Sequence, residues 1–121
     1  MKIEITDHRK IFTIQKEFSE LFPFLKIEFH AKPHTSDGAH ANKIISHSSK
    51  TLGSCRTSHK KGFITLTPNI TLRELQQTFS DVYGITIAVS VKAPGGWIDA
   101  SSKDGWSLEK QNLAGQKSGS I

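Results

Sequence analysis

Apolar and polar residues recur in the same order in two stretches of the chain. Shifted by 61 positions, residues 2–22 align with residues 63–83 without a gap. Identical residues stand at five of these positions: Ile3 and Ile64, Thr6 and Thr67, Gln15 and Gln76, Phe18 and Phe79, and Ser19 and Ser80. Each stretch alternates with period two and then changes to helical spacing, which predicts a strand, a turn and an amphipathic helix, followed by a second strand.

The first copy contains all four of these signals. Residues 2–6 alternate and predict a half-buried strand. Asp7 follows, and we expect its carboxylate to accept hydrogen bonds from the free N–H groups of the next turn. Residues 11–22 carry apolar side chains at helical spacing, and Pro23 ends the predicted helix. Residues 25–30 alternate again and predict the second strand.

The second copy has clearer boundaries. Residues 63–67 predict a strand. Thr71 and Glu74 have the spacing of a capping box, in which each side chain binds the other residue's backbone N–H. Gly84 stands where a left-handed helix C-terminus is expected. Residues 85–92 predict the fourth strand.

The chain continues beyond the two copies. Residues 97–100 predict a strand that pairs back after a Pro-Gly-Gly turn, residues 107–114 predict a short helix capped by Ser107, and residues 116–121 predict a flexible tail. Two tandem βαβ units predict a two-layer α+β sandwich with a ferredoxin-like βαββαβ core and a C-terminal strand–helix extension. Residues 1–115 then form a single domain.

Residues 31–61 show neither period. They are rich in Ser, Thr, Gly, His and Lys, and their few large apolar residues allow only a short helix or strand around residues 44–55. Irregular segments of this length are uncommon in small domains and are usually functional or mobile. We therefore expect a basic, histidine-rich, irregular insertion.

Positive charge is concentrated in the same region. The chain has a formal net charge of +5, and residues 26–61 contain the whole of this excess of Lys and Arg over acids. Such a patch attracts anionic partners such as nucleic acid. The candidate polyanion-binding residues are Lys32, Lys43, Lys50, Arg56, Lys60 and Lys61.

Histidine and cysteine raise two further hypotheses. His30 with His34, and Cys55 with His59, are ligand types and spacings that suit zinc, but paired cysteines are missing, so these four are weak candidates and we expect no metal or cofactor. Cys55 with His34, His47 or His59 could form a thiolate–imidazole pair. The sequence lacks a nucleophile elbow, a glycine-rich phosphate loop and a paired-carboxylate signature, so we expect no enzymatic activity.

Three aromatic residues indicate binding to another protein. Tryptophan is enriched at interface hot spots, which makes Trp97 and Trp106 candidate anchors. Phe63 and Trp97 on one open sheet face would form an apolar patch, whereas the aromatic-rich signature of RNA-binding sheets is absent. We expect a non-enzymatic binding or adaptor domain with a protein partner. The alternative is sequence-nonspecific binding of nucleic acid or another polyanion through residues 26–61.

Composition also predicts where the protein works. No apolar run reaches the ~18 residues of a membrane span. The N-terminus lacks the hydrophobic region of a signal peptide. Cys55 is the only cysteine, so an internal disulfide is excluded. These features predict a cytoplasmic protein that does not contact a membrane.

Residues near the C-terminus carry one resemblance. The run from Gly96 to Asp99, followed by residues 104–112, resembles the C-terminal part of a family of small bacterial proteins of unknown function. The helix predicted within residues 71–84 agrees with this. The resemblance implies no activity, cofactor or residue role.

Overall fold

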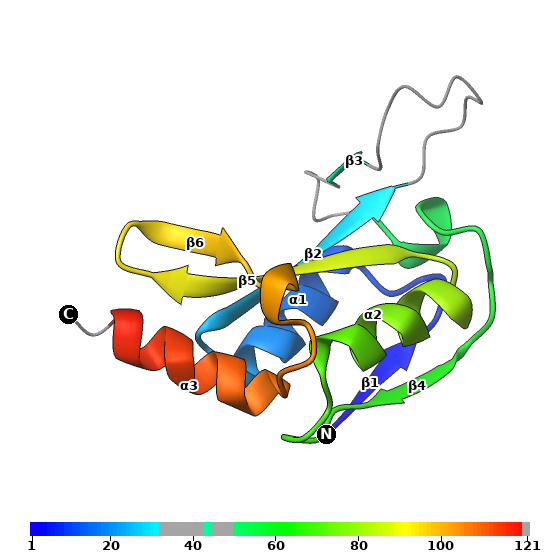
Figure 1. Cartoon of the computed structure of the whole chain (residues 1–121). Coiled ribbons are helices and arrows are strands. Elements are labelled where there is room, and N and C mark those ends of the chain that lie inside the picture. The colour runs from blue at the N-terminus through cyan, green and yellow to red at the C-terminus, as the bar shows by residue number, and fades with distance from the viewer. Residues whose placement is uncertain (32–42, 45–49, 120–121) are drawn as a thin grey trace.

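The computed structural model of the chain describes residues 1–31, 43–44 and 50–119 (Figure 1). This part contains the α-helices α1 (Ile11–Leu21), α2 (Leu72–Asp81) and α3 (Leu108–Gly119). Its strands are β1 (Lys2–Ile5), β2 (Leu25–Ala31), β3 (Lys43–Ile44), β4 (Gly62–Thr65), β5 (Thr86–Ala93) and β6 (Gly96–Asp99). Two short 3-10 helices are η1 (Leu52–Ser54) and η2 (Ser101–Lys103). The predicted α+β class is confirmed.

The strands form two antiparallel sheets. Among the described residues β1 pairs with β4 alone, whereas the larger sheet has the order β3-β2-β5-β6. The ferredoxin-like order is not confirmed, because it requires the four repeat strands to share one sheet. Here the first strands of the two copies pair with each other, and so do the second strands. Period-two alternation identifies a strand and its inward face, but not its partner.

One face of the larger sheet packs against the helices. Along β2 the residues Leu25, Ile27 and Phe29 are fully buried, and their antiparallel partners on β5 are Val91, Val89 and Ile87. The Phe29 ring meets the Phe79 ring of α2 edge to face at 5.6 Å between centroids. In Figure 1 all three helices lie below this sheet. The alternate residues of β2 and β5 point to the opposite face.

Helix α2 has the predicted ends. The Thr71 hydroxyl accepts a hydrogen bond from the Glu74 N–H at 3.1 Å, and the Glu74 carboxylate accepts one from the Thr71 N–H at 3.3 Å. The capping box is therefore present. Gly84 has a φ of 67°, the left-handed conformation that favours glycine.

Helix α1 begins differently. Its N-cap residue, Lys10, makes no side-chain capping bond. The Ile11 N–H instead donates to the backbone carbonyl of Lys50 at 2.9 Å, so a distant segment satisfies the start of this helix. The helix ends at Leu21, before Pro23, as the sequence predicts.

Residues 50–53 belong to the fold and repeat a feature of the second copy. Three backbone hydrogen bonds recur in both copies. In the first copy the N–H groups of Ile11, Leu52 and Gly53 donate to the carbonyls of Lys50, Arg9 and Asp7. In the second copy the equivalent N–H groups of Leu72, Leu108 and Glu109 donate to the carbonyls of Trp106, Ile70 and Pro68. Leu52 and Leu108 are both fully buried. The repeat thus extends beyond residues 22 and 83, and residues 50–54, which we expected in the irregular insertion, are part of the packed fold, whereas residues 55–61 form no helix or strand.

The two copies are related by a pseudo-two-fold axis. Ile3 lies opposite its equivalent Ile64 in the β1–β4 pair. In the β2–β5 pair, Glu28 lies opposite Ala88. These two are equivalent residues, because Glu28 follows the buried Ile27 and Ala88 follows the buried Ile87. Equivalent residues face each other in this way across a two-fold axis.

Helix α3 packs closely on the larger sheet. A Cβ at Gly115 would lie 2.9 Å from the Val91 Cγ2 atom and 3.0 Å from the Phe24 backbone oxygen, so only glycine allows this approach. The Asn112 side chain accepts a hydrogen bond from the Phe24 N–H at 2.8 Å. The helix continues to Gly119, although we expected a tail from residue 116, and residues 120–121 lie outside the described part. No helix within the described ranges is long and apolar enough to cross a membrane.

Candidate functional site

Trp97 lies on the outward face of the larger sheet, between two lysines. It is paired with Lys92 across β5–β6, which directs both side chains to the same face. The Nζ atoms of Lys26 and Lys92 lie 5.5 and 5.4 Å from the ring centroid, within the range of cation–π attraction. The Trp97 side chain is still 41% exposed. An aromatic surface with two ammonium groups is therefore open to solvent.

Ile98 exposes a second large apolar side chain on the same strand. Successive residues of a strand point to opposite faces, and the partner of Ile98 is Val91, on the helix-covered face. Ile98 is nevertheless 57% exposed, because β6 is the last strand of the sheet. Strand β6 therefore exposes apolar surface on both of its faces.

The outer edge of β6 offers backbone hydrogen-bonding groups. The Ala100 N–H donates to the Val89 carbonyl at 2.9 Å, which fixes the phase of the ladder. Hydrogen-bonding direction alternates along an antiparallel strand, so the backbone N–H and C=O of Ile98, like those of Ala100, point towards β5. The backbone N–H and C=O groups of Trp97 and Asp99 point away from the sheet. In the described ranges no strand pairs with this edge.

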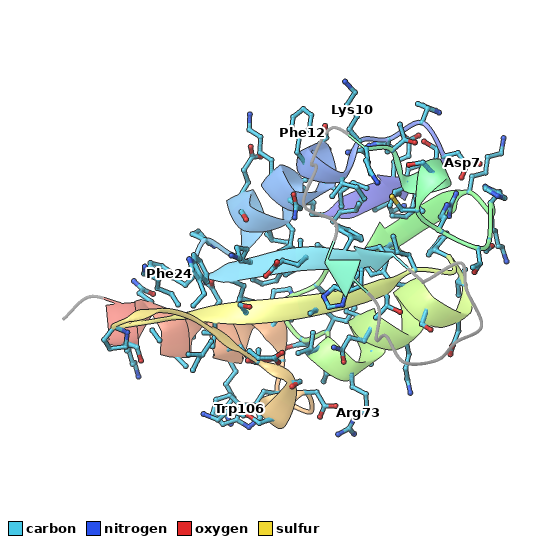
Figure 2. The ribbon with its side chains drawn as sticks, turned by 90° about the horizontal axis from the view of Figure 1, so that it is seen from above. Asp7, Lys10, Phe12, Phe24, Arg73 and Trp106 are labelled. Carbon is cyan, nitrogen blue, oxygen red and sulfur yellow. The ribbon has the colours of Figure 1, made fainter. Side chains whose placement is uncertain are left out.

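Trp106 repeats the arrangement of Trp97. The Nζ atoms of Lys103 and Lys110 lie 4.6 and 4.0 Å from its ring centroid. Figure 2 shows Trp106 beside η2, the turn into which β6 leads. Nearby, Asp104 forms an ion pair with Arg73 at 2.8 Å and raises the pKa of that guanidinium above its usual value.

The sheet face around Trp97 has balanced charge. Glu28 lies 3.8 Å from Lys26. Hydrogen bonds from the side chain and backbone of Ser101 lower the pKa of Asp99, which faces the same way as Trp97, so this carboxylate stays ionised at neutral pH. Two acids and two lysines share this face, which is not the uniform positive field that a polyanion requires.

Arg56 takes part in a structural ion pair. Its side chain is fully buried, and its Nε and Nη2 atoms lie 3.0 and 2.8 Å from Asp7 Oδ1. The other carboxylate oxygen of Asp7 (labelled in Figure 2) lies 2.9 Å from His59 Nδ1. Arg56, and then His59, lower the pKa of Asp7 below its usual value.

Two predictions about these residues are wrong. The Asp7 carboxylate does not bind the N–H groups of the turn that follows it; both of its oxygens are instead bound by residues 49 or more positions away. Arg56 is not available to a polyanion, because its guanidinium is buried and neutralised by Asp7. The pair instead ties residues 56–59 to the turn between β1 and α1.

The other polyanion candidates have varied positions. Lys50, Lys60 and Lys61 are exposed. Lys32 lies outside the described residues, as does the side chain of Lys43, whose backbone forms part of β3. Three of the six candidates are therefore exposed in the described part, and the polyanion hypothesis stays a prediction.

Among the residues that the structure describes, the metal and thiol candidates form no site of three or more ligands. Within the described ranges no group of three or more His, Cys, Asp or Glu side chains is placed to hold a metal ion. Cys55 Sγ lies 3.4 Å from the Ser54 hydroxyl, and His59 is bound to Asp7. His34 and His47 lie outside the described residues. The Nε2 atom of His30 is buried without a hydrogen-bond partner in the described part.

Phe63 does not join Trp97 in one patch. It is 61% exposed on β4, opposite Glu4 of β1. Because β4 and β6 belong to different sheets, the single open face on which we expected both rings does not exist. Sequence reasoning also missed Ile98. The signal was the Pro-Gly-Gly turn, which makes residues 96–99 a hairpin arm and thus a natural edge strand.

No family model, curated protein or solved structure matches the chain. The resemblance of residues 96–112 to a bacterial family therefore stays a prediction.

Proposed function

We propose that the protein is a non-catalytic binding domain that docks another protein along β6. One observation supports this above all. Trp97 and Ile98 are adjacent, point to opposite faces of β6, and are both exposed. Together they surround a strand edge that is unpaired throughout the described part of the chain.

The chemistry of an open edge favours an extended polypeptide as the ligand. A partner strand satisfies the outward N–H and C=O groups of Trp97 and Asp99, and backbone bonding of this kind supplies affinity. Its side chains would then pack on Trp97 on one face and Ile98 on the other, which supplies specificity. Natural proteins usually cover or blunt an apolar edge, and a docked partner would serve that purpose.

Polyanion binding through residues 26–61 remains the second hypothesis, with less support. Arg56 does not support this hypothesis, because it is buried in an ion pair with Asp7. The lysines beside Trp97 share their sheet face with Glu28 and Asp99, which would repel a phosphate backbone.

A peptide selection tests the proposal without a known partner. Random peptides displayed on phage are selected on the immobilised protein, and the selected peptides are then titrated against variants. Trp97→Ala removes the anchor and should weaken binding about tenfold or more, as for an interface hot spot. Asp99→Pro removes an outward N–H, whereas its control Asp99→Ala removes the same carboxylate and keeps the N–H.

Binding that is lost with Asp99→Pro and kept with Asp99→Ala supports strand addition. Peptides that bind Trp97→Ala and Asp99→Pro as well as the original protein would show that the binding surface lies elsewhere.

A further inference from the structure

The chain has two tryptophans, and each ring lies near two lysines, although Trp97 is exposed and Trp106 is half-buried. Each ring has two lysine Nζ atoms between 4.0 and 5.5 Å from its centroid. The lysines come from four separate parts of the chain: Lys26 from β2, Lys92 from β5, Lys103 from η2 and Lys110 from α3. Independent elements therefore converge to place ammonium groups at both rings.

Three of these four lysines make no direct ion pair within the described part of the chain, although Glu28 and Asp99 lie on the Trp97 face. Of the four lysines, Lys26 alone has an ion pair among the described residues, with Glu28 at 3.8 Å. A carboxylate brought to either ring would lie beside ammonium groups already held near an apolar surface. Complementary charge of this kind steers a partner and selects it over others.

The two rings also lie along one path. β6 carries Trp97 and leads directly into η2. The Lys103 N–H donates to Ala100 at 3.1 Å and the Trp106 N–H donates to Lys103 at 3.0 Å. These short turns keep Trp106 near the end of β6, beside η2 (Figure 2). An extended segment paired with β6 would therefore pass from one lysine-flanked ring towards the other.

We infer that the segment bound along β6 is acidic, with carboxylate side chains at Lys26 and Lys92 and at Lys103 and Lys110. This inference rests on the proposed docking at β6 and specifies the partner's chemistry. A single-stranded nucleic acid could also stack on the rings. It has no backbone N–H and C=O pattern to match the edge, and it carries a phosphate at every nucleotide, whereas a peptide can place carboxylates at the lysines and uncharged side chains beside Asp99 and Glu28.

The test compares the composition of selected peptides. The random library is selected on the original protein and on three variants of equal charge loss: Lys26→Gln with Lys92→Gln, Lys103→Gln with Lys110→Gln, and, as the control, Lys60→Gln with Lys61→Gln. The control lysines are exposed and precede β4, which belongs to the other sheet from β6. Circular dichroism confirms that each variant is folded.

We expect the peptides selected on the original protein to be enriched in Asp and Glu. Their affinity should fall about tenfold or more on either tryptophan-flanking variant, and less than about twofold on the control. Replacing their Glu and Asp by Gln and Asn should cause the same loss.

Each contrary result has its own meaning. Peptides that are not acidic, but whose binding still requires Trp97, would contradict the inference that the partner is acidic. They would still support the proposed docking at β6. Failure to select any peptide that depends on Trp97 would overturn the docking itself. A labelled oligothymidine that binds through these lysines, with no selected peptide, would overturn both in favour of single-stranded nucleic acid.

Discussion

Ile3 and Ile64 lie directly opposite each other across the β1–β4 pair, and they are also equivalent residues of the two copies. Their side chains are 1% and 3% exposed. One contact therefore joins the halves of the chain and lies on the pseudo-two-fold axis that relates them. The β2–β5 pair joins the halves a second time, so neither copy completes its sheet alone.

The first prediction concerns this isoleucine pair. Ile3→Ala or Ile64→Ala should lower the free energy of unfolding by about 2–5 kcal/mol, because each leaves a cavity in the core. The double variant should lose less than the sum, with a coupling of about 0.5 kcal/mol or more between contacting residues. Urea titration measures all three. Thr65→Ala, on the exposed face of β4, should change stability by no more than about 0.5 kcal/mol.

The second prediction tests whether the repeat includes residues 50–53. Leu52→Ala and Leu108→Ala should both cost about 2–5 kcal/mol in urea unfolding, because both side chains are fully buried at equivalent positions. Leu113→Ala, on the exposed side of α3, is the control and should cost no more than about 0.5 kcal/mol. A Leu52 variant as stable as the control would mean that this segment does not dock.

The third prediction concerns the dependence of stability on pH. Arg56 and His59 hold the pKa of Asp7 below its ordinary value of 3.8, so at low pH the unfolded chain binds a proton that the folded protein resists. The stabilisation is fully present above 3.8 and is lost as the pH falls through the folded-state pKa.

Asp7→Asn should therefore be less stable than the original protein at neutral pH, and the difference should shrink in acid. Urea midpoints measured from neutral pH to below 3.8 check this. Glu20→Gln, at an exposed acid of α1, provides the comparison. An Asp7→Asn difference that stayed constant across this range would argue against the ion pair with Arg56.

The fourth prediction concerns the left-handed turn after α2. Gly84→Ala should lower stability by about 1 kcal/mol or more, because φ is 67° and an added Cβ would lie 2.5 Å from the Ser58 backbone nitrogen. At Gly95, in the hairpin tip, an added Cβ meets nothing within 4 Å. The midpoint temperature of thermal unfolding should be lower for Gly84→Ala than for Gly95→Ala. Equal midpoints would contradict the turn geometry.

The sequence predicted much of the fold. Period, capping and turn signals identified α2 with its Thr71–Glu74 box, a strand that pairs back after the Pro-Gly-Gly turn, and the inward faces of β2 and β5. These features are local, because each depends on residues a few positions apart. The repeat likewise predicted that Ile3 and Ile64 share one core.

Strand pairing and the candidate site were less accessible. Nothing in the alternation of residues 2–6 shows that β1 pairs with β4 rather than joining the larger sheet. The ungapped repeat stops at residue 83, because Pro23 and Phe24 stand where the second copy has only Gly84, which hides the equivalence of Leu52 and Leu108. The sequence predicted that Arg56 is an exposed cation, because its partner Asp7 lies 49 positions away and no local pattern joins the two.

Hydrogen exchange of the β6 amides, followed by NMR, tests the open edge directly. In the free protein the Ile98 N–H should exchange slowly, since it faces β5, whereas those of Trp97 and Asp99 should exchange fast. Adding a selected acidic peptide should slow the hydrogen exchange of the Trp97 and Asp99 amides. If those two amides are already protected in the free protein, or stay unprotected with the peptide bound, then β6 is not the docking edge.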